Sequence, residues 1–261
     1  MALITLTTDF GTGSPYAAAI KGVIYSLNPA ATVVDISHEI PAQDIRHAAV
    51  ILDEVTDLFP PGSIHVVVVD PGVGTDRGLV FVRIGRQNYL APDNGVLSRL
   101  ARRKTPAKIV RLTEGRYWLH PVSATFHGRD ILAPVAARLS LELDPDWLGV
   151  AQETLVMLDW PEVTAKPQTI RGSVLLIDGF GNLITDITAE ILADRPKDRP
   201  LRVSCAGRSV EGLCRTYGDR PDGTLVALIG SGGRLELAVV GGHAAGLLKA
   251  RVGEPVVVEW K

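Results

Sequence analysis

The chain has 261 residues, of which 46% are hydrophobic and 21% are charged, and its formal net charge is -2. This composition is typical of a globular protein with a hydrophobic core, and the near balance of charge gives no general attraction to nucleic acid or to a membrane surface. No run approaches the roughly 20 apolar residues of a membrane-spanning helix, and two cysteines, Cys205 and Cys214, are too few for a disulfide framework. We therefore expect a cytoplasmic protein with no nucleic-acid partner and no membrane partner.

Strands and helices are predicted to alternate through the first half of the chain. The N-terminal stretch has no basic segment and reaches Asp9 too soon for a signal peptide, so residues 2–8 are predicted to be the first strand. The further predicted elements are helix 16–27, strand 32–36, helix 44–59, a strand ending at Asp70, a hairpin of residues 79–84 and 89–91, a helix opened by residues 92–95 and running through Leu100, and helix 131–141. This order favours an α/β domain with a mostly parallel sheet.

The pattern changes after Leu158. Residues 159–168 contain two prolines and show no periodicity, so they are predicted to be a linker. The remaining segment is rich in short β patterns separated by glycines, at residues 170–177, 183–187, 201–205, 208–213, 225–229, 235–240 and 256–260. We therefore expect a domain of residues 1–158 and a smaller antiparallel barrel or sandwich of residues 169–261.

The segment VVVVDPGVGTDRG, residues 66–78, is the most informative of the first half. Four consecutive valines predict a strand buried on both faces, because an exposed strand would alternate apolar and polar residues. Pro71 cannot donate to a sheet, so Asp70 is expected at the carboxyl end of the strand, where α/β sheets bind ligands. Arg77 follows in the same loop. The two charges predict either a salt bridge that closes the loop or a ligand site.

Two other segments deliver polar groups where they could meet a ligand. Asp9 ends the first strand, and it could equally be a turn or N-cap residue before the next helix. His127 lies in the segment FHGRD just before a helix, although a single histidine is more often a structural hydrogen-bonding group. Arg129 and Asp130 of the same segment are predicted to be a charge pair at the helix start.

The glycine-rich segments do not predict a nucleotide-phosphate site. Residues 70–78 lack the lysine and hydroxyl of a P-loop, and residues 230–242 place glycines around a strand instead of between a strand and a helix. No HExxH, CxxC or nucleophile-elbow pattern is present, and we expect no catalytic metal.

Seven segments, taken together, resemble one enzyme family over nearly the whole chain. In chain order they are LTTDFGTGSPYAAAIKGVIYSLNP, VVDISHEIP, VVVVDPGVGT, APDNGVLS, FHGRDILAPVAARL, LLIDGFGNLITDI and GSGGRLELAV. They are similar to the S-adenosyl-L-methionine hydrolases, also called S-adenosylmethionine hydroxide adenosyltransferases, which are relatives of the fluorinases and chlorinases. The resemblance implies an N-terminal α/β domain, a C-terminal β-barrel domain and a homotrimer. It also implies active sites between the N-domain of one subunit and the C-domain of its neighbour.

The resemblance also implies roles for individual residues. Asp70, Arg77 and His127 match the family's catalytic triad, and Asp9 matches the acid that binds the ribose diol, a task suited to a carboxylate because it can accept hydrogen bonds from both hydroxyls. The positions that match substrate-binding residues of the second domain are Asp178, Asn182, Ser231, Glu236 and Val239.

The implied reaction converts water and S-adenosylmethionine into adenosine and methionine by attack at the ribose C5′, with no cofactor. The leaving thioether is neutral, so the difficulty lies in activating water. A single cation about 4 Å away favours hydroxide by roughly 4 kcal/mol at an effective dielectric near 20, or about 3 pKa units. Arg77 alone would therefore leave hydroxide a minor species, and Asp70 could take the proton while His127 donates or relays. The order of these events stays open.

Two alternatives remain at this point. A halogenase of the same fold would use chloride or fluoride at C5′, and the presence of Asp70, Arg77 and His127 argues for water instead. A non-catalytic adenosine or S-adenosylmethionine sensor would bind the ligand and release no methionine.

Overall fold

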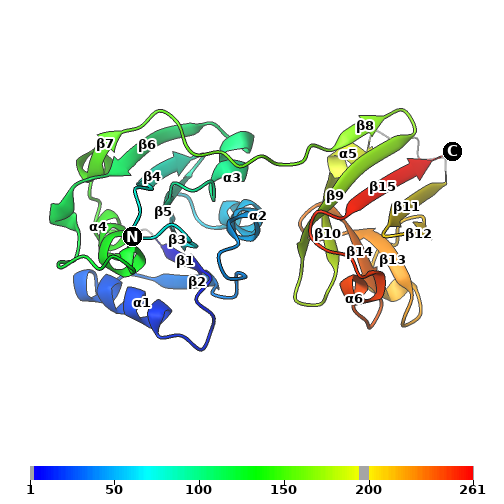
Figure 1. The fold of residues 1–261 in the computed structure, drawn as a ribbon, viewed down its shortest axis with the longest axis horizontal. Coiled ribbons are helices and arrows are strands. Elements are labelled where there is room, and N and C mark those ends of the chain that lie inside the picture. The colour runs from blue at the N-terminus through cyan, green and yellow to red at the C-terminus, as the bar shows by residue number, and fades with distance from the viewer. Residues whose placement is uncertain (1–2, 194–199, 261) are drawn as a thin grey trace. The chain divides into compact units, whose positions relative to one another are not determined.

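The computed structural model describes residues 3–193 and 200–260. The chain divides into two compact units, Met1–Leu158 and Asp159–Lys261 (Figure 1). No helix among the described residues is both long enough and apolar enough to cross a membrane.

The first unit is built on a sheet with the strand order β2-β1-β3-β5-β4-β6-β7 (Figure 1). Its main elements are β1 (Ile4–Thr8), α1 (Tyr16–Leu27), β2 (Val33–Ser37), α2 (Ile45–Val55), β3 (Ile64–Val68), β4 (Leu79–Ile84), β5 (Gln87–Pro92), α3 (Ser98–Arg103), β6 (Pro106–Leu112), α4 (Ala133–Leu139) and β7 (Gly149–Ala151). Strands β2, β1, β3 and β5 pair in parallel, and β4, β6 and β7 add antiparallel pairs on one side. The predicted α/β domain is therefore confirmed, with a parallel core inside a mixed sheet.

The valine strand is covered on both faces, as its sequence predicts. Val66 and Val68 pack in a core with α1 and α4, whereas Val67 and Val69 pack in a second core with α2 and α3. All four valines are buried. Successive side chains of a strand point to opposite faces, so an unbroken apolar run is what this central position requires.

Several elements of this unit differ from the prediction. The helix expected to open at residues 92–95 begins only at Ser98, because Pro92 still pairs in β5 and the Asn94 side chain donates to Val69 O. Strands β6 and β7 were not predicted. The apolar residues of β6 do not alternate with polar ones, and its position depends on antiparallel pairing with β4, whereas β7 has only three residues.

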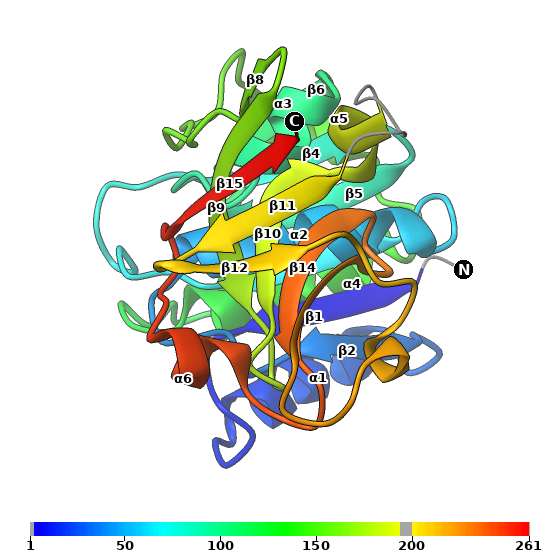
Figure 2. The same cartoon turned by 90° about the vertical axis from the view of Figure 1, so that its right-hand side faces the viewer.

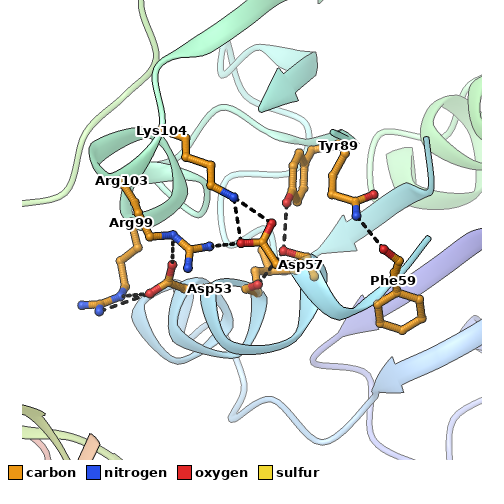
Figure 3. Close-up of polar contacts among 10 residues, drawn as sticks. Asp53, Asp57, Phe59, Tyr89, Arg99, Arg103 and Lys104 are labelled. Atoms are coloured by element: carbon orange, nitrogen blue, oxygen red, sulfur yellow. Dashed lines mark hydrogen bonds and ion pairs between the residues drawn. The ribbon is translucent and has the colours of Figure 1, made fainter. Parts of the chain in front are cut away.

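An ion-pair network holds α2 and α3 together on one face of the sheet (Figure 3). Arg103 Nε lies 3.2 Å from Asp53 Oδ1, and Arg103 Nη2 lies 2.8 Å from Asp57 Oδ2. Lys104 Nζ lies 2.9 Å from the same Asp57 oxygen. The Lys104 hydrogen bond is the main cause that lowers the pKa of Asp57. This network joins elements of the first unit only, so we assign it to stability.

The second unit is an antiparallel sheet with the order β12-β11-β15-β9-β10-β14-β13, which curls into a nearly closed barrel (Figures 1 and 2). Its strands are β8 (Thr164–Lys166), β9 (Thr169–Ile177), β10 (Leu183–Thr188), β11 (Leu201–Cys205), β12 (Arg208–Glu211), β13 (Leu225–Ile229), β14 (Arg234–Val239) and β15 (Pro255–Trp260). The predicted barrel is confirmed. Two short helices, α5 (Ala189–Ala193) and α6 (Ala244–Leu248), were not predicted.

The predicted linker of residues 159–168 contains one strand. Strand β8 pairs antiparallel with the start of β9, Thr164 opposite Arg171. Three residues are too short for periodicity to show, and Pro167 lies in the connection that reverses the chain.

Candidate active site

The candidate catalytic residues lie where the direction of the parallel sheet's connections reverses. From β1 the chain passes through α1 to β2 on one side, and it then returns through α2 to β3 on the other side. Helices α1 and α2 pack on opposite faces. The connection after β1 thus runs toward one edge of the sheet, and the connection after β3 runs toward the other. Open α/β sheets bind ligands at the carboxyl ends of strands whose connections separate in this way. Asp9 and Asp70 follow those two strands.

Asp70, Arg77 and His127 form one connected group. Arg77 Nε donates to both carboxylate oxygens of Asp70, at 3.1 and 2.8 Å, and Arg77 Nη2 donates to Asp70 Oδ2 at 2.6 Å. The same Nη2 lies 2.8 Å from His127 Nδ1. The side chains of Arg77 and Asp70 are only 11% and 7% exposed. The predicted salt bridge is therefore present, and it also contacts the histidine, whereas the ligand site stays a prediction.

The arginine fixes the protonation state of the histidine. A guanidinium can only donate, so His127 Nδ1 must accept, and the proton of the neutral ring lies on Nε2. Burial lowers the pKa of His127 below its ordinary 6.5, and the charge of Arg77 lowers it further. No described residue forms a hydrogen bond with Nε2. His127 therefore presents a free N–H donor near neutral pH.

Two glycines bring the loop of Arg77 and the segment of His127 together. A Cβ on Gly74, whose φ is +80°, would lie 2.4 Å from Ala124 O. A Cβ on Gly128 would lie 2.7 Å from Val68 Cγ1 of β3. Gly128 also begins a π-helical turn, Gly128–Leu132, a distortion that is frequent at functional sites. The backbone thus approaches closely on both sides of the group.

Replacing Gly128 with alanine is expected to lower the free energy of unfolding by about 1–3 kcal/mol, the usual cost of overpacking. The added methyl group pushes the turn away from Val68, so His127 moves off Arg77 and turnover falls as well. Urea unfolding and steady-state kinetics measure the two effects. Gly22→Ala is the matched control, because a Cβ there meets nothing within 4 Å; equal effects in both variants would contradict this explanation.

Asp9 lines the same pocket as Asp70 and His127. It is not the N-cap of α1, which is Pro15. Its Oδ2 accepts from Gln43 N at 2.8 Å. The pocket, of about 230 Å³, is lined by Asp9, Phe10, Gln43, Val68, Asp70, Pro71, Val73, Thr125, Phe126, His127 and Gly128. Sequence reasoning did not identify Phe10, Gln43 or Phe126 as pocket residues, although the first and last stand beside predicted site residues.

In the same segment, Arg129 and Asp130 form the predicted charge pair. Arg129 Nε donates to Asp130 Oδ1 at 2.6 Å. Asp130 is fully buried, and it also accepts from Ser123 N. The pair therefore ties the turn after His127 to the preceding loop.

In the second unit, Asp178 and Asn182 close the turn between β9 and β10. Asn182 donates its backbone N and its side-chain Nδ2 to the two Asp178 oxygens, at 2.8 and 2.9 Å. Phe180 N donates to Asp178 as well, while its own ring is 79% exposed. The turn is thus rigid and presents an aromatic tip.

Glu236 lies near this turn and is nearly buried. It stands opposite Ile184 of β10, and Tyr217 Oη donates to its Oε2 at 2.8 Å. Burial raises the pKa of Glu236, and the charge of Asp178 raises it further. Burial, followed by the contact with Glu236, raises the pKa of Tyr217 to about 12. No signal in the sequence identified Tyr217.

The other two predicted binding residues of this unit lie apart from that group. Ser231 is exposed in the turn that joins β13 and β14. Val239 ends β14, and its side chain packs in the barrel core. Alternate strand residues face opposite sides, so the Val239 side chain points away from the face of Glu236. A binding role for it stays a prediction, and it would have to use the backbone.

Among the described parts of the chain, residues 3–193 and 200–260, no group of three or more His, Cys, Asp or Glu side chains is placed to hold a metal ion. The site itself offers a carboxylate, a guanidinium and a neutral imidazole N–H donor beside a small pocket.

Two family models match the chain, one in each unit. Residues 4–149 match the SAM hydroxide adenosyltransferase N-terminal domain, and residues 172–257 match the C-terminal domain of that name. The chain is 39% identical to a (R)-S-adenosyl-L-methionine hydrolase of Thermus thermophilus, over 95% of this chain and 96% of that one. A fluorinase of Actinoplanes is 24% identical over 71% of each chain. A solved structure of an uncharacterized conserved protein from Thermotoga maritima superposes with a TM-score of 0.93 at 32% identity, covering 98% and 99% of the two chains.

Proposed function

The chain belongs to the SAM hydroxide adenosyltransferase family, and from that membership we propose how this enzyme hydrolyses S-adenosyl-L-methionine to adenosine and methionine. The observation that supports the proposal most strongly is the connected group of Asp70, Arg77 and His127 beside the Asp9 pocket. A water molecule bound by that group attacks the ribose C5′, and the sulfonium leaves as a neutral thioether.

Asp70 is the group that takes the proton from water. Arg77 holds its Oδ2 strongly, whereas Oδ1 receives a single, longer hydrogen bond of 3.1 Å and keeps a free lone pair. Asp70 lines the Asp9 pocket, where the substrate would bind. His127 Nε2–H donates to the oxygen of the same water and orients it.

The charge arrangement favours proton transfer during the attack. A free cation at about 4 Å would favour hydroxide by roughly 4 kcal/mol, but here the charge of Arg77 is paired with Asp70 at 2.6 Å. The field of such a pair falls off faster than that of a free cation, so it stabilises preformed hydroxide less. The proton therefore passes to Asp70 as the C5′–O bond forms, and in-line alignment supplies a further large share of the rate.

The protein is a homotrimer in which the substrate is bound by the N-terminal domain of one subunit and the C-terminal domain of a neighbouring subunit. Asp9 accepts from the ribose hydroxyls, and Asp178, Asn182, Ser231 and Glu236 of a neighbouring subunit contact the adenosine and methionine ends. Two observations support this division. The Asp9 pocket is smaller than the roughly 300–1,000 Å³ typical of ligand sites, and Asp178 and Glu236 form a separate polar group on the barrel. The expected location in the cytoplasm stays a prediction.

The test is product analysis with the two sulfonium epimers of S-adenosylmethionine in excess chloride. We expect adenosine and methionine in equal amounts, formed from the R epimer that the Thermus relative's name specifies, and a single ¹⁸O in adenosine from labelled water. Formation of 5′-chloro-5′-deoxyadenosine as the main product would instead identify a halogenase. Tight binding without methionine release at high protein concentration would identify a sensor.

A further inference from the structure

A second pocket borders the catalytic group on the side away from Asp70. It has a volume of about 560 Å³ and is lined by Thr75, Asp76, Arg77, Gly78, Leu79, Arg111, Leu112, Thr113, Trp118, Val122, His127 and Ile131. His127 lines both this pocket and the Asp9 pocket, whereas Asp70 lines only the latter and Arg77 only the former. We call this second hollow the rear pocket.

The stoichiometry of the reaction points to a role for the rear pocket in supplying water. Each turnover consumes one water and releases one proton, in addition to adenosine and methionine. A substrate that fills the Asp9 pocket displaces the water there, and that pocket holds only about 230 Å³. Water that reaches the catalytic group while the substrate is bound therefore needs another direction of approach.

We propose that the rear pocket is the entry for the nucleophilic water. Building on the proposed hydrolysis, water passes from the rear pocket along the His127 ring to the position beside Asp70. The C5′–O bond forms as the C5′–S bond breaks, and the electron pair of the latter stays on sulfur. The proton goes to Asp70, and it returns to solvent through the Asp9 pocket when the products leave, because Asp70 faces that side.

The composition of the rear pocket fits a passage for water. Thr75 and Thr113 supply exposed hydroxyls and Arg111 an exposed guanidinium, whereas Trp118, Val122 and Ile131 form an apolar wall. Of the lining residues, only Asp76 carries a carboxylate that can pair with the charge of Arg111. A wide, mixed surface of this kind holds mobile water better than it would bind an organic ligand tightly.

The experiment fills the rear pocket without touching the catalytic group. Val122→Trp and Thr113→Trp each place an indole in the hollow. We expect kcat to fall at least about tenfold, by the equivalent of roughly 1.4 kcal/mol, with KM within about twofold of the native value and unchanged adenosine binding. Leu58→Trp is the matched control, since Leu58 is 83% exposed and lines neither pocket. Thermal unfolding verifies that each variant is folded.

A second readout does not depend on turnover. Diethyl pyrocarbonate modifies accessible imidazole nitrogens, and mass spectrometry of the His127 peptide measures the extent. With saturating adenosine and methionine, His127 of the native enzyme should still react, and Val122→Trp should protect it. Complete protection by the products in the native enzyme would overturn the proposal, as would an unchanged kcat in both folded tryptophan variants. If the native enzyme itself releases no adenosine from S-adenosylmethionine, the proposed function fails instead.

Discussion

Replacing Asp70 with alanine is expected to lower kcat by about 10³- to 10⁴-fold, the upper part of the range for general-base catalysis. The variant loses the proton acceptor, and the freed charge of Arg77, which favours hydroxide, offsets only part of that loss. Binding of adenosine should change by less than about threefold, because Asp9 and the second domain hold the ligand. Single-turnover kinetics and calorimetric titration separate the two effects.

Asp76→Ala is the matched control for this experiment. Asp76 lies in the same loop and is exposed, and its hydrogen bond with Arg111 uses only the backbone oxygen, which accepts. We expect its kcat to stay within about threefold of the native value. Loss of adenosine binding in Asp70→Ala, of a size similar to its loss of kcat, would make Asp70 a ligand contact or a structural residue and would contradict the assigned role.

The sequence predicts the catalytic strand well because its constraints are local. Four valines require burial on both faces and are buried, although β3 ends at Val68 and not at Asp70, the end predicted from Pro71. Nothing local, however, places His127 beside Arg77, since fifty positions separate them in the chain. That contact depends on the approaches at Gly74 and Gly128, whose partners are Ala124 and Val68. Only the resemblance to a family linked the three residues in advance.

In the second domain, the sequence contains a signal for the core position of Val239 but none for the contact of Tyr217 with Glu236. In the sequence RLELAV of β14, alternation places Leu235, Leu237 and Val239 on one face and Glu236 on the other. The core position of Val239 could therefore have been predicted from its own strand. Tyr217 could not, because its contact with Glu236 joins a loop to a strand across nineteen positions.

Mixing two inactive variants is expected to restore activity if the site is shared between subunits. Asp70→Ala removes the proton acceptor of the first domain, and Asn182→Ala removes a side chain that is bonded to Asp178 in the second. In a closed ring assembled at random from equal amounts, a given interface joins an intact first domain to an intact second domain with a probability of about one quarter. Each variant alone should be inactive.

The measurement is the specific activity of hetero-oligomers, which are formed by co-expression with two different tags and purified over both. A trimer that carries both tags has one such interface out of three, so recovery to about one third of the native activity supports sites built between neighbouring copies. Mixing the purified variants without subunit exchange is the control and should recover nothing. If each site were built within one chain, every site in the mixture would carry one lesion, so hetero-oligomers as inactive as the parents would refute the shared site while leaving the role of Asp70 intact.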